Sequence, residues 1–340
     1  KTLSVLILKV DYLDKFKGCL MGVAIGDTLG APFEGRLRDM IHERFTDFGG
    51  FIDKNPGLFN TYTDDTQLTL HVAQALIEGN GFNRDNFIRE FTSWLDDPPV
   101  GPGFGCLSSI QKLKHGIPWK QAASNSGGNG TVMRVSPIGL FFSKSPKQMK
   151  SAAIHSSTLT HSHPAASAGA VVIARAVSYL LKKAPKKSFS TEEFIDTLMR
   201  SISIGQDEIW KEFQENLAKL KENLNMDIES GLIKFSQVGV KSPYFIEQYL
   251  GKAFVHPYAM STVICSLFVF LKLKESFEKC IFALATAGGD TDTAGAIGGS
   301  LIGTYQGYEN IPSHLTNLVK GRKKVLKVSK KLHQSFTKRF

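Results

Sequence analysis

Two acidic clusters in this chain have the residue types of a site for hard metal ions. The first is Tyr62–Thr66 (YTDDT) and the second is Gly288–Thr293 (GGDTDT), and each stands where a helix is expected to begin. Acids at a helix start also have a structural explanation, because they cap free N–H groups and complement the macrodipole. Four carboxylates brought together, however, repel one another unless cations lie between them. Carboxylate and hydroxyl oxygens suit Mg²⁺ or Mn²⁺, and the absence of His or Cys partners argues against zinc.

A glycine-rich segment could contact a phosphate group. Ser126–Gly130 (SGGNG) leads into Thr131–Arg134 (TVMR), and such a loop allows backbone N–H groups to approach an anion closely. The segment is neither a Walker loop nor a GxGxxG motif after a strand, and a plain turn explains it equally well. His161, in Thr160–Pro164 (THSHP), precedes an apolar segment, where a lone histidine is more often structural than ligand-binding.

The elements that must position these residues are predicted to be helices. Residues 16–30 combine an apolar stripe with many glycines and alanines, which indicates close contact with a neighbouring helix. Thr63 opens a second helix, and Ser190 with Glu193 forms a capping box for another. Strand-like alternation is confined to Val132–Phe142. With no repeat and no linker, we predict one all-α domain over residues 1–340, with a peripheral helical insertion at 206–249.

Composition and charge exclude several classes of protein. The 340 residues are 42% hydrophobic and 21% charged, which excludes a disordered or collagen-like chain. Apolar runs are too short for a membrane span. The net charge is +10, but residues 320–340 hold nine basic residues and no acid, so the remainder carries about +1. The spacing of Val325, Val328, Leu332 and Phe336 predicts a docked helix at 320–340 with a basic outer face, which does not favour a nucleic-acid or membrane partner. Four cysteines without CxxC spacing favour a reducing, intracellular and cytoplasmic location.

Together these motifs resemble the ADP-ribosylhydrolase family, also called ADP-ribosylglycohydrolases, which includes dinitrogenase reductase-activating glycohydrolase. The resemblance covers residues 16–312 and rests on the order of five segments: Gly22–Gly35 (GVAIGDTLGAPFEG), the Thr-Asp-Asp cluster, the glycine-rich loop, Thr160-His161 and the Gly-Gly-Asp-Thr-Asp-Thr cluster. It implies a compact orthogonal helical bundle whose active site holds two Mg²⁺ or Mn²⁺ ions.

The resemblance also implies a role for each site residue. Thr63, Asp64 and Asp65 would ligate one metal ion, Asp290 and Thr293 the other, and Asp292 would bridge both. Glu34 would be the mobile acidic residue that closes over the metals or handles a proton, and catalysis would depend on Glu34, Asp64 and Asp292. Contacts to the ADP-ribose would come from Ser126, Gly128, Asn129, Gly130 and His161. Asp27 is also part of the family pattern, with a buried structural hydrogen bond as its expected role.

The function expected from the resemblance is hydrolysis of the glycosidic bond between ADP-ribose and a modified protein side chain or small acceptor. Some arginine-directed members carry an Asp where our alignment places Gly101, and the Gly-x-Gly-x-Gly loop at 101–105 is more similar to the serine-directed branch. Two alternatives stay open: an ADP-ribose-binding module without turnover, and a structural protein like the lens crystallins of this family. We expect a monomer that binds the product ADP-ribose.

Overall fold

The computed structural model describes residues 10–44, 48–59, 61–183, 189–203 and 207–340, and within them the backbone is helical without any extended strand pairing. The first nine residues of the expected domain and Gln206 of the expected insertion lie outside the described residues. The helices of the first half are α1 (Tyr12–Gly30), α2 (Arg38–His42), α3 (Phe48–Lys54), α4 (Asp64–Glu78), α5 (Arg84–Ser93), α6 (Phe104–Lys114), α7 (Trp119–Ala122), α8 (Ser136–Phe141) and α9 (Pro146–Thr158). Those of the second half are α10 (Pro164–Leu181), α11 (Thr191–Ser201), α12 (Glu208–Glu222), α13 (Ile228–Phe235), α14 (Ala259–Leu273), α15 (Phe277–Ala285), α16 (Thr291–Gln306), α17 (Ser313–Leu318) and α18 (Arg322–Arg339). Short 3₁₀ turns are η1 (Ala31–Phe33), η2 (Pro56–Phe59), η3 (Asn129–Thr131), η4 (Glu247–Tyr249) and η5 (Tyr308–Asn310). The all-α prediction is confirmed.

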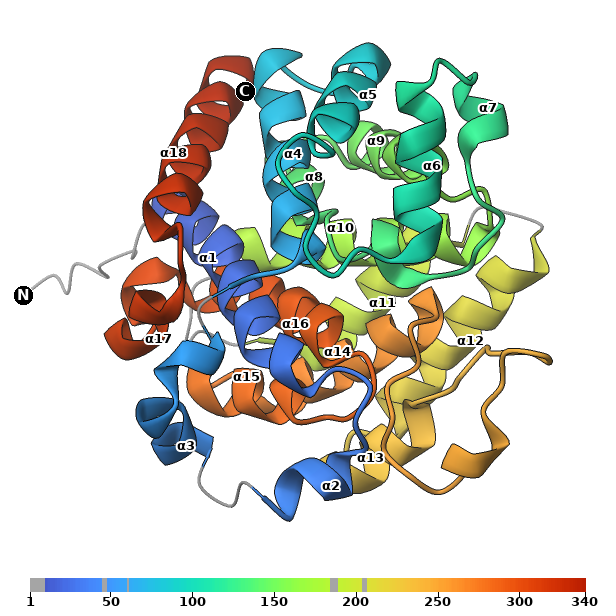
Figure 1. Cartoon of the computed structure of the whole chain (residues 1–340), viewed down its shortest axis with the longest axis vertical. Coiled ribbons are helices and arrows are strands. Elements are labelled where there is room, and N and C mark those ends of the chain that lie inside the picture. The colour runs from blue at the N-terminus through green and yellow to red at the C-terminus, as the bar shows by residue number, and fades with distance from the viewer. Residues whose placement is uncertain (1–9, 45–47, 60, 184–188, 204–206) are drawn as a thin grey trace, which may run out of the picture.

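Helices α1 and α16 pack against each other at the centre of the bundle, with α18 beside α1 (Figure 1). Glycines face each other along this pair: Gly22 lies against Gly299 and Gly26 against Gly295, and a Cβ on any of them would overlap backbone of the opposite helix. Small residues at four-residue spacing occupy one face of a helix, so the two backbones come into direct contact. This contact places the start of α16 beside the C-terminal end of α1, where Asp27 and η1 lie.

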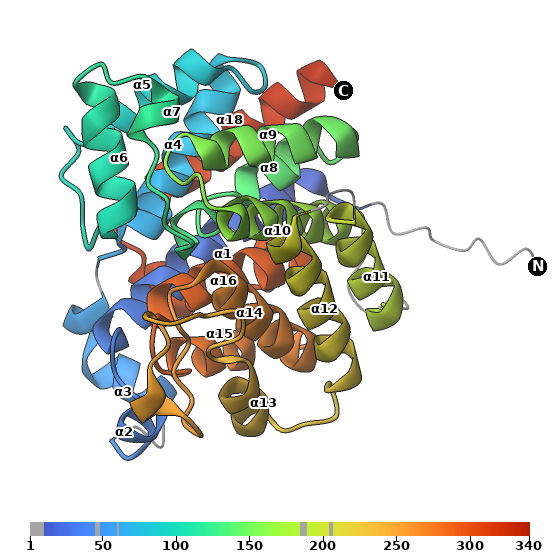
Figure 2. The ribbon, with the colours of Figure 1, turned by 90° about the vertical axis from the view of Figure 1, so that its right-hand side faces the viewer.

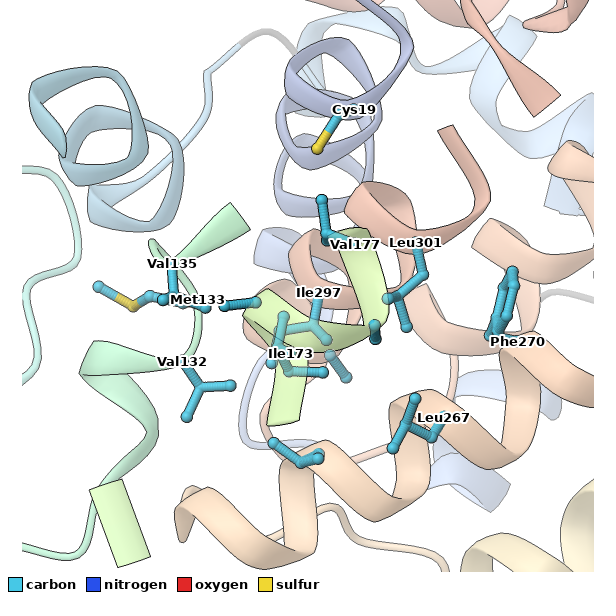
Figure 3. Packing of buried hydrophobic residues seen from close by; sticks show 14 of the residues in the cluster. Cys19, Val132, Met133, Val135, Ile173, Val177, Leu267, Phe270, Ile297 and Leu301 are labelled. Carbon is cyan, nitrogen blue, oxygen red and sulfur yellow. The ribbon is translucent and has the colours of Figure 1, made fainter. Parts of the chain in front are cut away.

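The apolar core surrounds α10. Figure 3 shows side chains of α10, α14 and α16 packed together, namely Ile173, Val177, Leu267, Phe270, Ile297 and Leu301. Helix α10 has the length and composition of a membrane span, but 89% of it is buried inside the protein. It is therefore the central helix of the core. The four cysteines are all buried and free.

The segment with strand-like alternation is not a strand. Val132–Phe142 begins just after η3, passes through a turn and then forms α8, which packs against α10. All of its side chains are buried, so the apolar pattern reflects burial on every side, which periodicity cannot distinguish from a buried strand.

The polar stretch from residue 207 to 249 and the basic C-terminus both form helices. Helices α12 and α13 lie beside α11 and α14 (Figure 2), with the chain from 236 to 256 returning toward the centre of the molecule. Helix α18 buries Val325, Leu332 and Phe336 against the bundle, leaves Val328 half-buried, and exposes its lysines.

Candidate active site

The predicted site residues meet at one cavity of about 970 Å³. Its wall contains eleven of the twelve residues expected to form the site: Glu34, Asp64, Asp65, Ser126, Gly128, Asn129, Gly130, His161, Asp290, Asp292 and Thr293. The twelfth, Thr63, is buried directly behind the wall. Helices α4 and α16 each contribute their first turn, and the remaining residues come from loops and from the 3₁₀ turn η3.

The first turn of α4 is held in place by Asp27 of α1. The buried Asp27 carboxylate accepts hydrogen bonds from the backbone N–H and the hydroxyl of Thr63, at 3.0 and 2.8 Å, and from both groups of Thr66. Thr63 is the N-cap residue of α4. Asp27 therefore has the structural role expected from the sequence, and it couples α1 to the orientation of the acidic turn.

The first turn of α16 is set by a glycine turn. Gly288 and Gly289 have φ of +82° and +76°, a backbone region that glycine adopts without penalty. Their backbones pair with two other segments, because Gly289 N–H donates to Arg36 O at 2.8 Å and Val255 N–H donates to Gly288 O at 2.9 Å. Asp290 then caps α16. The pairing with residues 35–36 brings Glu34 to the cavity wall.

Asp65 joins the two acidic turns. Its Oδ2 atom lies 3.4 Å from the hydroxyl oxygens of Thr63 and Thr293, which belong to α4 and α16 respectively. Its Oδ1 atom is buried and has no hydrogen-bond partner. An unpartnered buried carboxylate oxygen is costly, so this oxygen is available to a cation or a proton.

The carboxyl groups of the cluster are hard to ionise together. Burial, reinforced by the Asp27 charge, raises the pKa of Asp64 to about 8. Burial and the neighbouring acids raise the pKa of Asp65 and of Asp292 well above the ordinary value. Among the described residues, no three His, Cys, Asp or Glu side chains stand grouped to hold an ion as they are placed. The donors are nevertheless all oxygens, and their chemistry suits Mg²⁺ or Mn²⁺.

This electrostatic strain predicts how stability depends on pH. The pKa of an Asp in the unfolded chain is near 4, whereas the pKa of folded Asp64 is about 8. The protonated Asp64 carboxyl therefore stabilises the fold fully below the unfolded pKa, and this stabilisation is lost as pH rises through the folded pKa. Below about pH 6.5 the buried His161 opposes this trend, because burial lowers its pKa to about 3. We therefore expect the melting temperature of EDTA-treated protein to fall between pH 6.5 and 8. Mg²⁺ or Mn²⁺ should reduce that fall, and an equal fall with and without metal would contradict a cation site here.

The glycine-rich loop is bonded to the acidic cluster. Asn129 donates from Nδ2 to Asp290 Oδ2 at 2.8 Å and to the hydroxyl of Thr262 at 2.9 Å. Within the loop, Gly128 N–H donates to Ser126 Oγ at 3.1 Å. The loop is therefore joined directly to the first turn of α16, and a ligand in the cavity can contact both.

A further part of the cavity wall contains residues that sequence reasoning missed. They come from α12, the chain after α13 and the segment before α14: Ile209, Glu212, Gly239, Val240, Lys241, Ser242, Tyr244, His256, Pro257 and Tyr258. The Tyr258 ring fills the space beside Gly127, so a Cβ on Gly127 would overlap it. No motif in 207–249 signals that this stretch lines the cavity, because this part of the wall is built by long-range packing.

A loop before α6 covers the start of α4. Asp64 N–H donates to Val100 O at 2.8 Å, and Gly103 N–H lies 3.4 Å from Asp64 Oδ2. Gly101, with φ of +62°, faces the Thr63 side chain. Phe104 lines the cavity at its edge and is 86% exposed. The loop thus forms the edge of the cavity nearest the acids.

Comparisons with known proteins agree on one family. The sequence profile of the family ADP-ribosylglycohydrolase matches residues 8–340. ADP-ribosylhydrolase ARH3 of Xenopus tropicalis is 26% identical, with 96% of this chain and 97% of the relative covered. ADP-ribosyl-[dinitrogen reductase] glycohydrolase of Rhodospirillum rubrum is 26% identical over 88% of each chain. A solved structure described as an ADP-ribosylglycohydrolase-related protein complex shares the fold, with a TM-score of 0.67, 22% identity and coverage of 95% of this chain and 98% of that one.

Proposed function

Because the chain belongs to the ADP-ribosylglycohydrolase family, we propose that it is a metal-dependent hydrolase that releases ADP-ribose from an ADP-ribosylated protein or small conjugate. One observation carries the proposal: a single cavity joins the acidic turns of α4 and α16 to the glycine-rich loop through the Asn129–Asp290 hydrogen bond. Such a cavity offers an anion-binding loop for the phosphates next to a cluster of oxygen ligands.

The oxygen cluster suits two Mg²⁺ or Mn²⁺ ions. The unpartnered Oδ1 of Asp65 and the mutual repulsion of the acids support this fit. The residues proposed as ligands are Thr63, Asp64 and Asp65 for one ion, Asp290 and Thr293 for the other, and Asp292 for both. When bound, divalent ions supply positive charge that orients ribose hydroxyl groups and acidifies water.

The reaction places water on the anomeric carbon of the ribose as the bond to the acceptor breaks and the acceptor atom gains a proton. Such cleavages pass through an oxocarbenium-like transition state. Glu34 lies at the cavity wall, where desolvation and then the charges of Asp290 and Asp27 raise its pKa. We propose that its carboxylate accepts the proton of the attacking water.

The loop before α6, which forms the edge of the cavity, bears on which acceptor is cleaved. Gly101 faces Thr63 and brings no carboxylate to the place where arginine-directed relatives are expected to have one. The exposed Phe104 beside it offers an apolar surface to the acceptor. These features favour an acceptor other than arginine, with serine as the first to test.

The decisive experiment offers the protein a panel of ADP-ribosyl conjugates on arginine, serine and small acceptors, each with Mg²⁺, Mn²⁺ or EDTA. Release of ADP-ribose is measured by chromatography. We expect release from at least one conjugate with metal and none with EDTA. Tight binding of ADP-ribose without any release would instead establish the alternative, a binding module, and absence of both binding and release would favour a structural protein.

Replacing Gly128 with valine should weaken ADP-ribose binding about tenfold or more. The added side chain would keep the phosphates away from the loop, and the loss of about two hydrogen bonds between them has an effect of this size. The backbone of Gly128 is extended, with φ of −62° and ψ of 162°, so valine causes no backbone strain. Its Cβ would stand 3.1 Å from Ser126 Oγ and 3.9 Å from His161 Nε2, inside the cavity. Calorimetry measures the affinity, and Gly57→Val, where nothing lies within 4 Å, is the control. Unchanged affinity in folded Gly128→Val would remove the loop from the ligand site.

A further inference from the structure

Arg134 is a buried arginine that no acidic side chain of the described residues pairs with. It is 1% exposed, and its guanidinium lies 4.4 Å from the centre of the Phe91 ring. It donates from Nη1 to Cys106 Sγ at 3.0 Å and from Nη2 to Thr160 Oγ1 at 2.7 Å. A buried charge without an acidic partner destabilises a fold, so the position of Arg134 next to the cavity calls for an explanation in terms of the groups that it contacts.

The hydrogen bond from Arg134 to Thr160 determines the direction of the hydrogen bond between Thr160 and His161. An arginine can donate but never accept, so Thr160 Oγ1 is the acceptor in its bond with Arg134. The Thr160 hydroxyl lies 2.9 Å from His161 Nδ1, and Thr160 is fully buried. Its hydrogen therefore has one partner among the described residues, which is Nδ1. A hydroxyl that donates to Nδ1 requires this nitrogen to carry no proton.

The proton of the His161 ring then resides on Nε2, which faces the cavity. Gly105, Gly128 and Gly130 surround this atom, and Cβ positions built on them lie 3.4, 3.9 and 3.5 Å from it. The three glycines leave space around Nε2, and no described residue accepts a hydrogen bond from it. Burial, aided by the Arg134 charge and by His163, lowers the pKa of His161 to about 3, so the ring stays neutral.

We infer that Arg134 and Thr160 are positioning residues that hold His161 in the neutral Nε2–H tautomer, so that it offers a hydrogen-bond donor to an oxygen of the ligand. The ligand identity, ADP-ribose, rests on the proposed function, whereas the tautomer does not. An arginine suits this position because it can only donate to Thr160 Oγ1, whereas a carboxylate there would accept the hydroxyl hydrogen and draw it away from Nδ1.

The tautomer can be measured directly by ¹⁵N–¹H correlation spectra of protein labelled at histidine, with the His161 signals assigned by their loss in His161→Gln. In wild type we expect Nδ1 to show the shift of an unprotonated nitrogen and Nε2 that of a protonated one, unchanged between pH 5 and 8. Addition of ADP-ribose should shift the Nε2–H signal. A protonated Nδ1 in wild type would overturn the inference.

Variants at Thr160 separate positioning from packing. Thr160→Val keeps the shape and removes the hydroxyl, so Nδ1 should lose its partner and ADP-ribose affinity should fall about 3- to 10-fold, the effect of about one hydrogen bond. Thr160→Ser should retain both the spectrum and the affinity. Thr158→Val, at the end of α9 two residues before Thr160, is the matched control, because the Thr158 hydroxyl donates to His155 O. Wild-type spectra and affinity in Thr160→Val would refute the positioning role of Arg134 and Thr160. If wild type binds no ADP-ribose, the proposed function fails, while the spectra still decide the tautomer.

Discussion

Replacing Glu34 with glutamine should lower turnover of a cleavable ADP-ribosyl conjugate by about 10²–10⁴-fold, the usual contribution of general acid–base catalysis. The change preserves shape, and the backbone groups of Gly35 and Arg36 that pair with Gly289 are not altered. Affinity for ADP-ribose and the melting temperature should therefore change little. Steady-state kinetics at saturating substrate measure the loss, with Glu222→Gln, at the exposed end of α12, as a control.

The same assay distinguishes a proton-handling acid from a metal ligand. Asp292 is buried, and Thr293 N–H donates to its Oδ1 at 2.8 Å. Because we propose that Asp292 ligates both ions, Asp292→Asn should weaken metal binding and turnover together. Excess Mg²⁺ or Mn²⁺ should restore part of the Asp292→Asn activity and none of the Glu34→Gln activity. Full turnover by Glu34→Gln would leave the hydrolase standing but remove Glu34 from its mechanism.

Replacing Gly299 with alanine should destabilise the protein by about 3 kcal/mol or more, the upper end of ordinary overpacking. A Cβ at this position would overlap the backbone of Gly22 in α1, and backbone atoms cannot move aside by changing rotamer. Helices α1 and α16 would have to separate. Urea unfolding measures the change in the free energy of unfolding.

The sign of this effect is diagnostic. An alanine in a helix interior normally stabilises by up to about 1 kcal/mol relative to glycine, so a Gly299→Ala protein of unchanged or higher stability would refute the close contact. Gly57→Ala, with open space around it, should lie within about 0.5 kcal/mol of wild type. Gly22→Ala should behave like Gly299→Ala, and because the two positions touch, the effects should not add.

The amino-acid sequence alone determines the features that depend on residues close together in the chain. Thr63 and Asp290 cap α4 and α16 as short polar residues before an apolar helix should, and Ser190 caps α11 at Glu193 N–H. The two acidic clusters were recognisable because their residues are neighbours in the chain. The all-α class follows from helical periodicity. The strand-like alternation of Val132–Phe142 does not decide its structure, since a segment buried on all sides carries no periodic signal.

Tertiary packing decided what periodicity and motifs do not encode. The contact of Gly22 with Gly299 joins α1 to α16, and Asp27 of α1 holds the first turn of α4, so two acidic turns more than 200 residues apart meet at one cavity. Glu212 and Lys241, which also line the cavity, come from a polar stretch without a motif, because that stretch is placed by the packing of α12 and α13 against α14 and not by its neighbours in the sequence. The proton on His161 likewise depends on Arg134, which lies far from it in sequence: hydrogen-bond direction is a property of the assembled network, and only the folded chain brings donor and acceptor together.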